Sequence, residues 1–207
     1  MAFQTLDLGI DSSVWQSGLS LDAFHAQIEQ LSDRRALRLR LATVAFAPYQ
    51  KERYARISQP IRVSVLTEGW WGDSLMVLPI VVRLVEAIPQ AELRLFVRSK
   101  EPQLTAAYAA RGIVNIPTIS FFNADFRELG TWVERSQEAH RQVAAWKAAH
   151  PEFGAILADD QLAPEERRAR LQPWLQRMRA EMGWWYSDRL QQATLDEFDA
   201  ILANLDR

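Results

Sequence analysis

The feature that most constrains the fold is an alternation of strand-like and helix-like segments between residues 61 and 149. The segment Ile61–Thr67 is rich in β-branched residues and predicts a strand, whereas Ser74–Ile88 is apolar on most of its surface and predicts a buried helix. A second strand at Ala91–Ser99 and a helix at Pro102–Ala110 continue the pattern. Because a helix joins the first two strands, we expect them to be parallel.

The remainder of this segment predicts two further strands and one helix. The strands, residues 118–123 and 127–133, are separated by the short link 124–126, which is hairpin spacing, so they should be antiparallel. Residues 135–150 then predict a helix that ends before Pro151. The predicted order is βαβαββα, which belongs to the α/β class with a four-stranded mixed sheet.

Helical extensions are predicted on both sides of this segment. Residues 1–60 contain short helical patterns, the first with Ser20 as its N-cap. Residues 151–207 predict longer helices, with a kink or a break at Pro173. We expect the N-terminal extension, the α/β domain at residues 61–150 and the C-terminal extension to form one compact unit.

The chain of 207 residues contains no cysteine. That absence excludes disulfides, thiolate metal sites and cysteine nucleophiles. The three histidines, His25, His140 and His150, are far apart in the sequence and are interpreted as surface residues. The sequence therefore predicts neither a metal site nor a bound cofactor.

Charge and hydropathy limit the partners and the compartment. The formal net charge is −2, which gives no basic field to attract nucleic acid or an anionic membrane surface. No stretch of eighteen apolar residues is present, so no membrane span is predicted. The N-terminal residues lack the basic region of a secretory signal, and we expect a cytoplasmic protein.

Three motifs in the central segment suggest a family. The residues Trp70–Ser74 read WWGDS, Pro79 follows five residues later, and Gly112–Thr118 reads GIVNIPT. This pattern resembles the thioredoxin fold, whose W-C-G-x-C frame is matched at Trp70 and Gly72. More narrowly, the frame and the helical N-terminal extension resemble a branch of bacterial thioredoxin-like proteins. The resemblance implies the strand order 2-1-3-4 and a cis peptide bond between Ile116 and Pro117.

The departures from the family pattern decide the chemistry. Trp71 stands where thioredoxins have the attacking cysteine, and Ser74 stands where they have the resolving one. Dithiol exchange needs a thiolate and a second thiol, so this activity is excluded. The buried acid that the resemblance places before the motif is replaced by Val65.

The polar residues of the motif allow two interpretations. Ser74 near a helix N-terminus could activate glutathione, but no histidine is in sequence range to act as its base. Alternatively, Asp73 and Ser74 cap the helix by accepting hydrogen bonds from its free N–H groups, which is the preferred interpretation. Glu68 and Asp73 could form a carboxylate pair, although a solvent-facing loop explains both more simply.

The tryptophan pair is also open to two interpretations. Trp70 is expected to pack beside the motif, as it does in the fold that the sequence resembles. Trp71 either packs within the chain, which we favour, or forms a contact platform for a partner.

These observations predict a redox-inactive thioredoxin-like protein that binds a protein or peptide partner. The expected groove lies at Trp71, Ile116, Pro117 and Thr118, where the backbone beside the cis-proline could pair with an extended chain. The alternative is a glutathione-dependent transferase-like enzyme that uses the fold without cysteine. A homo-oligomer formed through the added helices is compatible with both.

Overall fold

The computed structural model describes residues 8–187 and 189–205, which divide into two compact units. The first unit contains residues 8–135 and 195–205, and the second contains residues 136–187 and 189–194. The first unit holds the sheet and all the motif residues.

The sheet has the four predicted strands in the order β2-β1-β3-β4. Its strands are β1 (Ile61–Thr67), β2 (Ala91–Val97), β3 (Thr118–Phe122) and β4 (Glu128–Val133). β1 and β2 pair in parallel, while β1 with β3 and β3 with β4 pair antiparallel. The predicted α/β fold, its strand order and its strand directions are confirmed.

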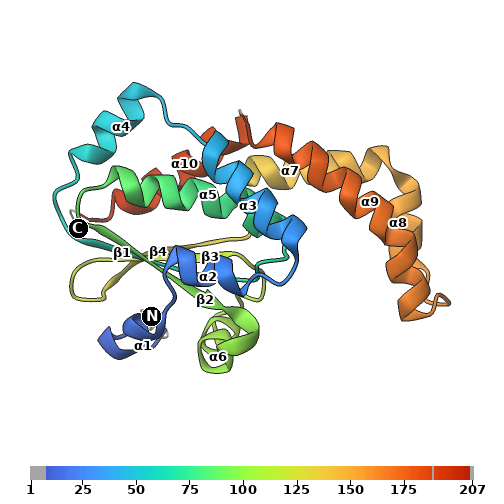
Figure 1. Ribbon diagram of the computed structural model, residues 1–207, viewed down its shortest axis with the longest axis horizontal. Coiled ribbons are helices and arrows are strands. Elements are labelled where there is room, and N and C mark those ends of the chain that lie inside the picture. The colour runs from blue at the N-terminus through green and yellow to red at the C-terminus, as the bar shows by residue number, and fades with distance from the viewer. Residues whose placement is uncertain (1–7, 188, 206–207) are drawn as a thin grey trace, which may run out of the picture. The chain divides into compact units, whose positions relative to one another are not determined.

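The two faces of the sheet are covered by different helices (Figure 1). Helices α3 (Leu31–Thr43) and α5 (Gly72–Ala87) lie over one face, and α1 (Ser12–Ser17) and α6 (Pro102–Ala110) lie over the other. The remaining helices of this unit are α2 (Leu21–Gln27), α4 (Pro48–Ala55), the short 3-10 helix η1 (Arg98–Lys100) and the last part of α10 (Arg189–Leu202). The α/β arrangement thus buries both faces of the central strands.

Alternation along the strands supplies two cores. Phe122 packs with Trp15 and Tyr108 beneath the sheet. Its neighbour Phe121 points to the opposite face, where its ring centroid lies 5.5 Å from that of Phe198 in α10. Trp132 contacts the same Phe198 ring at 5.3 Å, so α10 is held to the sheet by aromatic contacts.

The N-terminal extension is joined to the outer edge of the sheet. Ser20 is the N-cap of α2, as predicted, and its side chain accepts a hydrogen bond from the Ala23 N–H. Leu19 exchanges two backbone hydrogen bonds with Leu95 of β2, at 2.8 and 2.9 Å. This bridge satisfies part of an otherwise open strand edge.

The second unit is helical. It consists of α7 (Gln137–Ala149), α8 (Pro151–Ala158), α9 (Pro164–Trp185) and the start of α10. Trp146 stacks on His150 with ring centroids 4.2 Å apart and also contacts Trp174, which joins α7 to α9. The break predicted at Pro173 is wrong, because α9 continues through that residue. Within the described residues, no helix combines the length and the hydrophobicity needed to cross a bilayer.

Candidate functional site

The turn between β1 and α5 contains a buried carboxylate. Glu68 follows the last residue of β1, is only 8% exposed, and accepts a hydrogen bond of 2.7 Å from the Ser99 N–H. Asp73 is 5% exposed. The expectation that both residues face solvent is therefore wrong: each is buried against a distant part of the chain.

Asp73 and Ser74 do not cap α5. The N-cap position is Trp71, and it makes no side-chain capping bond. Asp73 instead accepts two hydrogen bonds from Arg135, from Nε at 3.0 Å and from Nη2 at 2.6 Å. The Ser74 hydroxyl accepts a hydrogen bond from the hydroxyl of Thr67. The capping prediction fails because tertiary partners occupy both side chains.

The tryptophan pair stands at the surface of the turn. Trp70 was expected to pack, but 54% of its surface is exposed. Trp71 is half-buried, and its indole N–H is buried without a hydrogen-bond partner. The two rings meet edge to face, with centroids 5.7 Å apart. Their packing gives the turn a large apolar surface.

The predicted cis-proline is present. The peptide bond between Ile116 and Pro117 is cis, which confirms the expectation from the NIPT sequence. The Thr118 hydroxyl donates to the Asn115 carbonyl at 2.7 Å, and the Glu134 N–H donates to the Pro117 carbonyl at 2.8 Å. Within the described chain, the backbone N–H and C=O of Ile116 have no hydrogen-bond partner.

An open groove of about 580 Å³ adjoins this backbone. Trp70 and Trp71 line it together with Val114 and Ile116. Every lining residue lies between Glu68 and Glu134, so the described N-terminal helices do not line the groove. Of the four positions expected at the groove, two line it and two do not. Trp71 and Ile116 are lining residues, whereas Pro117 and Thr118 are buried and do not line the groove.

One wall of the groove is α6. Tyr108 on its inner side is 1% exposed and is bonded to Ser120 across 2.8 Å, and burial raises the pKa of its phenol. On the outer side, Ala106 and Ala109 are exposed and line the groove. The helix is thus fixed to the sheet on one side and presents only small side chains to the groove on the other.

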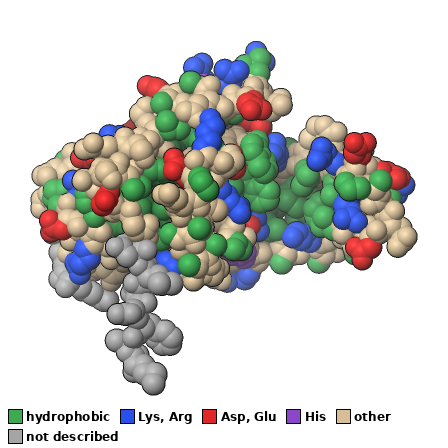
Figure 2. All heavy atoms as spheres, turned by 90° about the horizontal axis from the view of Figure 1, so that it is seen from below, with side chains coloured by type: hydrophobic (Ala, Val, Ile, Leu, Met, Phe, Trp, Pro, Cys, Tyr) green, Lys and Arg blue, Asp and Glu red, His purple; other side chains and the backbone are tan. Residues whose placement is uncertain are grey.

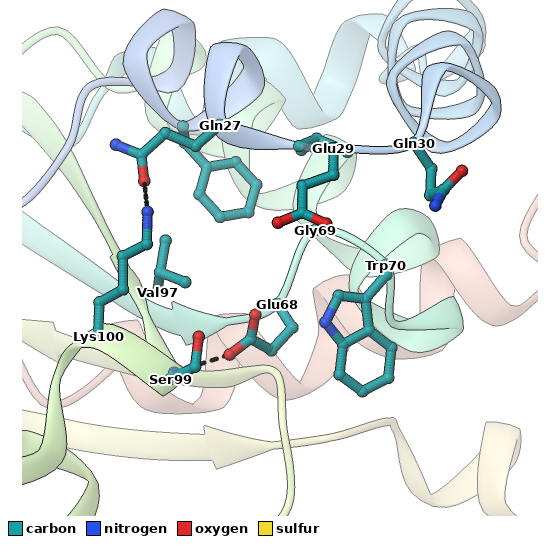
Figure 3. Close-up of a pocket in the computed structure, with 11 residues that line it drawn as sticks. Gln27, Glu29, Gln30, Glu68, Gly69, Trp70, Val97, Ser99 and Lys100 are labelled. Carbon is teal, nitrogen blue, oxygen red and sulfur yellow. Dashed lines mark hydrogen bonds between the residues drawn. The ribbon is translucent and has the colours of Figure 1, made fainter.

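A second, smaller hollow lies on the other side of the turn (Figure 3). Its volume is about 290 Å³, and the groove and this hollow share Glu68, Trp70 and Ser99. Gly69 brings the two chain segments together here, because a Cβ on this residue would lie 2.5 Å from Cγ1 of Ile28. A glycine is needed at this position for the N-terminal extension to approach the turn.

A family model described as thioredoxin matches residues 18–147. The chain belongs to this thioredoxin family. The match includes β1 to β4, the turn and the cis-proline, and it also extends back into the N-terminal helices. Among curated proteins, none matches the chain.

Two solved structures resemble this thioredoxin family protein. A protein of unknown function from Pseudomonas aeruginosa is 23% identical with a TM-score of 0.56, and the similarity covers 65% of this chain and 85% of that one. An HIV epitope-scaffold is 21% identical with a TM-score of 0.59, covering 94% of this chain and 96% of that one. At this level of identity the likeness shows the fold alone.

The histidines of this thioredoxin family protein do not gather at the site. His25 and His150 are half-buried rather than on the surface, and each has a ring nitrogen near a carbonyl oxygen, of Arg34 and Trp146 respectively. In the described part of the chain, no group of three or more histidine, aspartate or glutamate side chains is placed to hold a metal ion. On the face shown in Figure 2, basic and acidic side chains are interspersed with hydrophobic ones.

Sequence reasoning missed Arg135 as the partner of Asp73 and α6 as a wall of the groove. Arg135 stands 62 residues after Asp73, and no local pattern links the two. The alanines of α6 give this helix a side without large side chains, and in the sequence this is only a weak indication that the helix borders a groove.

Proposed function

We propose that this thioredoxin family protein is a redox-inactive binding module whose groove beside Pro117 holds an extended peptide. The absence of cysteine removes dithiol exchange, since a mixed disulfide can be neither formed nor resolved. What the chain retains of the thioredoxin site is the cis-proline segment and an open groove beside it. These two features suit binding without redox chemistry.

The observation that carries the proposal is the unpaired backbone of Ile116. Buried backbone N–H and C=O groups are nearly always hydrogen-bonded, and Ile116 is only 7% exposed. In the described chain its two backbone groups have no partner, and the residue lines the groove. An extended peptide could supply both partners by strand addition.

The rim of the groove supports the same conclusion. Trp70 and Val114 line it and leave 54% and 60% of their surfaces exposed. Exposed apolar side chains gathered on a concave surface are typical of protein and peptide binding sites, and tryptophan is enriched among residues that dominate binding energy.

The glutathione-dependent alternative has less support. Ser74 is 2% exposed, is bonded to Thr67 and does not line the groove, so its hydroxyl is poorly placed to meet a thiol. We expect no saturable heat when glutathione is titrated into the protein in a calorimeter. Saturable binding that places the glutathione sulfur against Ser74 would favour the transferase reading instead.

The proposal can be tested with a display library of random linear peptides. Ala106 and Ala110 are both exposed on α6, but only Ala106 lines the groove. We expect Ala106→Trp to weaken selected peptides at least about tenfold by filling the groove, while Ala110→Trp leaves their binding unchanged. Equal binding to the two variants would show that the peptides bind elsewhere.

Strand addition has its own readout. If the peptide pairs with Ile116, the backbone amide of Ile116 should exchange with deuterium more slowly in the complex than in the free protein. Slower exchange at Ile116 together with loss of binding in Ala106→Trp is the expected result. An unchanged rate at this amide in a saturated complex would refute pairing at this position.

A further inference from the structure

The hollow beside the groove has an unusual lining (Figure 3). It is enclosed by the end of α2 and the following residues Ile28–Gln30 on one side, and by the turn Glu68–Trp70 with the end of β2 on the other. The hollow has a volume of about 290 Å³ and is distinct from the groove, and Glu68 and Trp70 lie in the wall that the two spaces share. The groove and the hollow therefore adjoin at Glu68 and Trp70.

Glu68 forms the floor of the hollow with one carboxylate oxygen unpaired. Oε1 accepts the bond from the Ser99 N–H, while Oε2 has no hydrogen-bond partner among the described residues. The residue is 8% exposed, and its side chain points into the hollow (Figure 3). Oε2 is not among the fully buried polar atoms that lack a partner, so it is accessible from the hollow, and an accessible carboxylate oxygen is suited to a cationic donor.

The other groups around the hollow suit a cation with an apolar stem. The carboxylate of Glu29 faces the hollow from the opposite side, and the indole of Trp70 closes one end (Figure 3). Phe24 and Ile28 add apolar surface. The one cationic side chain among the lining residues, that of Lys100, lies at the end away from Trp70 and donates to Oε1 of Gln27 at 2.8 Å.

We propose that the hollow binds the guanidinium group of an arginine side chain. A guanidinium donates two parallel hydrogen bonds to a carboxylate and stacks on an aromatic ring, whereas a lysine ammonium does neither as well. Glu68 would accept the hydrogen bonds, Glu29 would balance the charge, and Trp70 would provide the ring. That the arginine belongs to the peptide in the groove rests on the proposed function, while the preference of the hollow for a guanidinium does not.

The test uses N-acetyl-arginine N-methylamide and the matching citrulline and lysine compounds. Citrulline has the shape of arginine without its charge. We expect the arginine compound to shift the NMR signal of the Trp70 indole N–H and to bind at least about tenfold more tightly than the citrulline compound, since the charged hydrogen bonds are lost in citrulline. Equal affinities, or tighter binding of the lysine analogue, would overturn the proposal.

Substitutions locate the site. Glu68→Gln keeps the shape and an acceptor for the Ser99 N–H, and should weaken the arginine compound by about 10-fold to 100-fold. Glu29→Gln, at an exposed residue, should weaken it a few-fold, about 2-fold to 5-fold. Glu52→Gln makes the same charge change at an exposed site outside the hollow and should have no effect. Unchanged affinity in both Glu68→Gln and Glu29→Gln refutes the site.

The Ala106→Trp variant separates this proposal from the proposed function. It fills the groove but does not touch the hollow, so it should abolish peptide binding and leave binding of the arginine compound intact. If no peptide binds the wild type while the arginine compound does, the groove proposal fails and the guanidinium site stands. If peptides bind the wild type while the arginine compound binds no more tightly than the citrulline compound, the guanidinium site fails and the groove proposal stands.

Discussion

Removing the Asp73 carboxylate should destabilise the first unit by several kcal/mol, far more than the loss of a helix cap. The side chain of Asp73 is 7% exposed and that of Arg135 is 14% exposed, and two hydrogen bonds join them. Breaking one partner of a buried pair costs about 3–5 kcal/mol, because the other charge is left unpaired. Arg135 keeps a contact of 2.6 Å with Glu134, which places Asp73→Ala at the lower end, about 3 kcal/mol.

A double-mutant cycle distinguishes the ion pair from a cap. Arg135→Met leaves Asp73 buried without a cation and should also cost about 3 kcal/mol. The double variant Asp73→Ala, Arg135→Met should cost less than the sum of the single variants, with a coupling energy of about 2 kcal/mol. If Asp73 acted as a cap, its removal would cost about 1 kcal/mol and would not depend on residue 135.

Urea denaturation followed by far-UV circular dichroism gives the free energies of unfolding. The pair Arg170–Glu166 in α9 is the control, because its side chains are 54% and 51% exposed at a distance of 2.6 Å. We expect a coupling below about 0.5 kcal/mol for that exposed pair. A coupling of the same small size between Asp73 and Arg135 would refute the reasoning from burial.

Two further predictions concern the segment Trp70–Ser74. In a denaturation experiment, Trp71→Ala should lower the free energy of unfolding by about 2 kcal/mol, which is less than for a fully buried tryptophan because Trp71 is half-buried. Trp71→Phe should be nearly neutral, because the indole N–H that it removes has no hydrogen-bond partner. A loss above about 2 kcal/mol for Trp71→Phe would contradict this prediction. In the insulin reduction assay with dithiothreitol, the wild type should not exceed the uncatalysed rate, because the chain has no cysteine. The variant with cysteine at both Trp71 and Ser74 should show a small rate above it. Wild-type activity well above background would contradict the argument from composition.

The fold could be predicted because its signals are local. β1 at Ile61–Thr67 and α6 at Pro102–Ala110 have the predicted bounds, since β-branched composition marks the strand and a proline at the first turn marks the helix. The short helix α1 was not predicted. It follows Asp11, whose side chain accepts hydrogen bonds from the N–H groups of Ser13 and Val14, and six residues are too few to show a helical period.

The details of the site could not be predicted because they depend on contacts distant in the sequence. Asp73 and Ser74 have the side chains of good caps, yet capping competes with every other partner that the fold brings near. Arg135 offers Asp73 two charge-assisted hydrogen bonds, which are stronger than a cap to a backbone N–H. Glu68 likewise finds its partner 31 residues later, at Ser99.

The residues at the positions that the resemblance assigns to the redox machinery form a consistent set. Val65 is fully buried, and a carboxylate at that depth without thiols to serve would be an unpaired charge. Ser74 has a hydroxyl partner in Thr67 and needs no further role. Trp70 is the exception, because 54% of the surface of this large aromatic side chain is exposed. Trp70 lines both the groove and the Glu68 hollow, and its exposure is explained if a ligand covers it. The NMR signal of the Trp70 indole N–H is therefore the one to measure in the titrations.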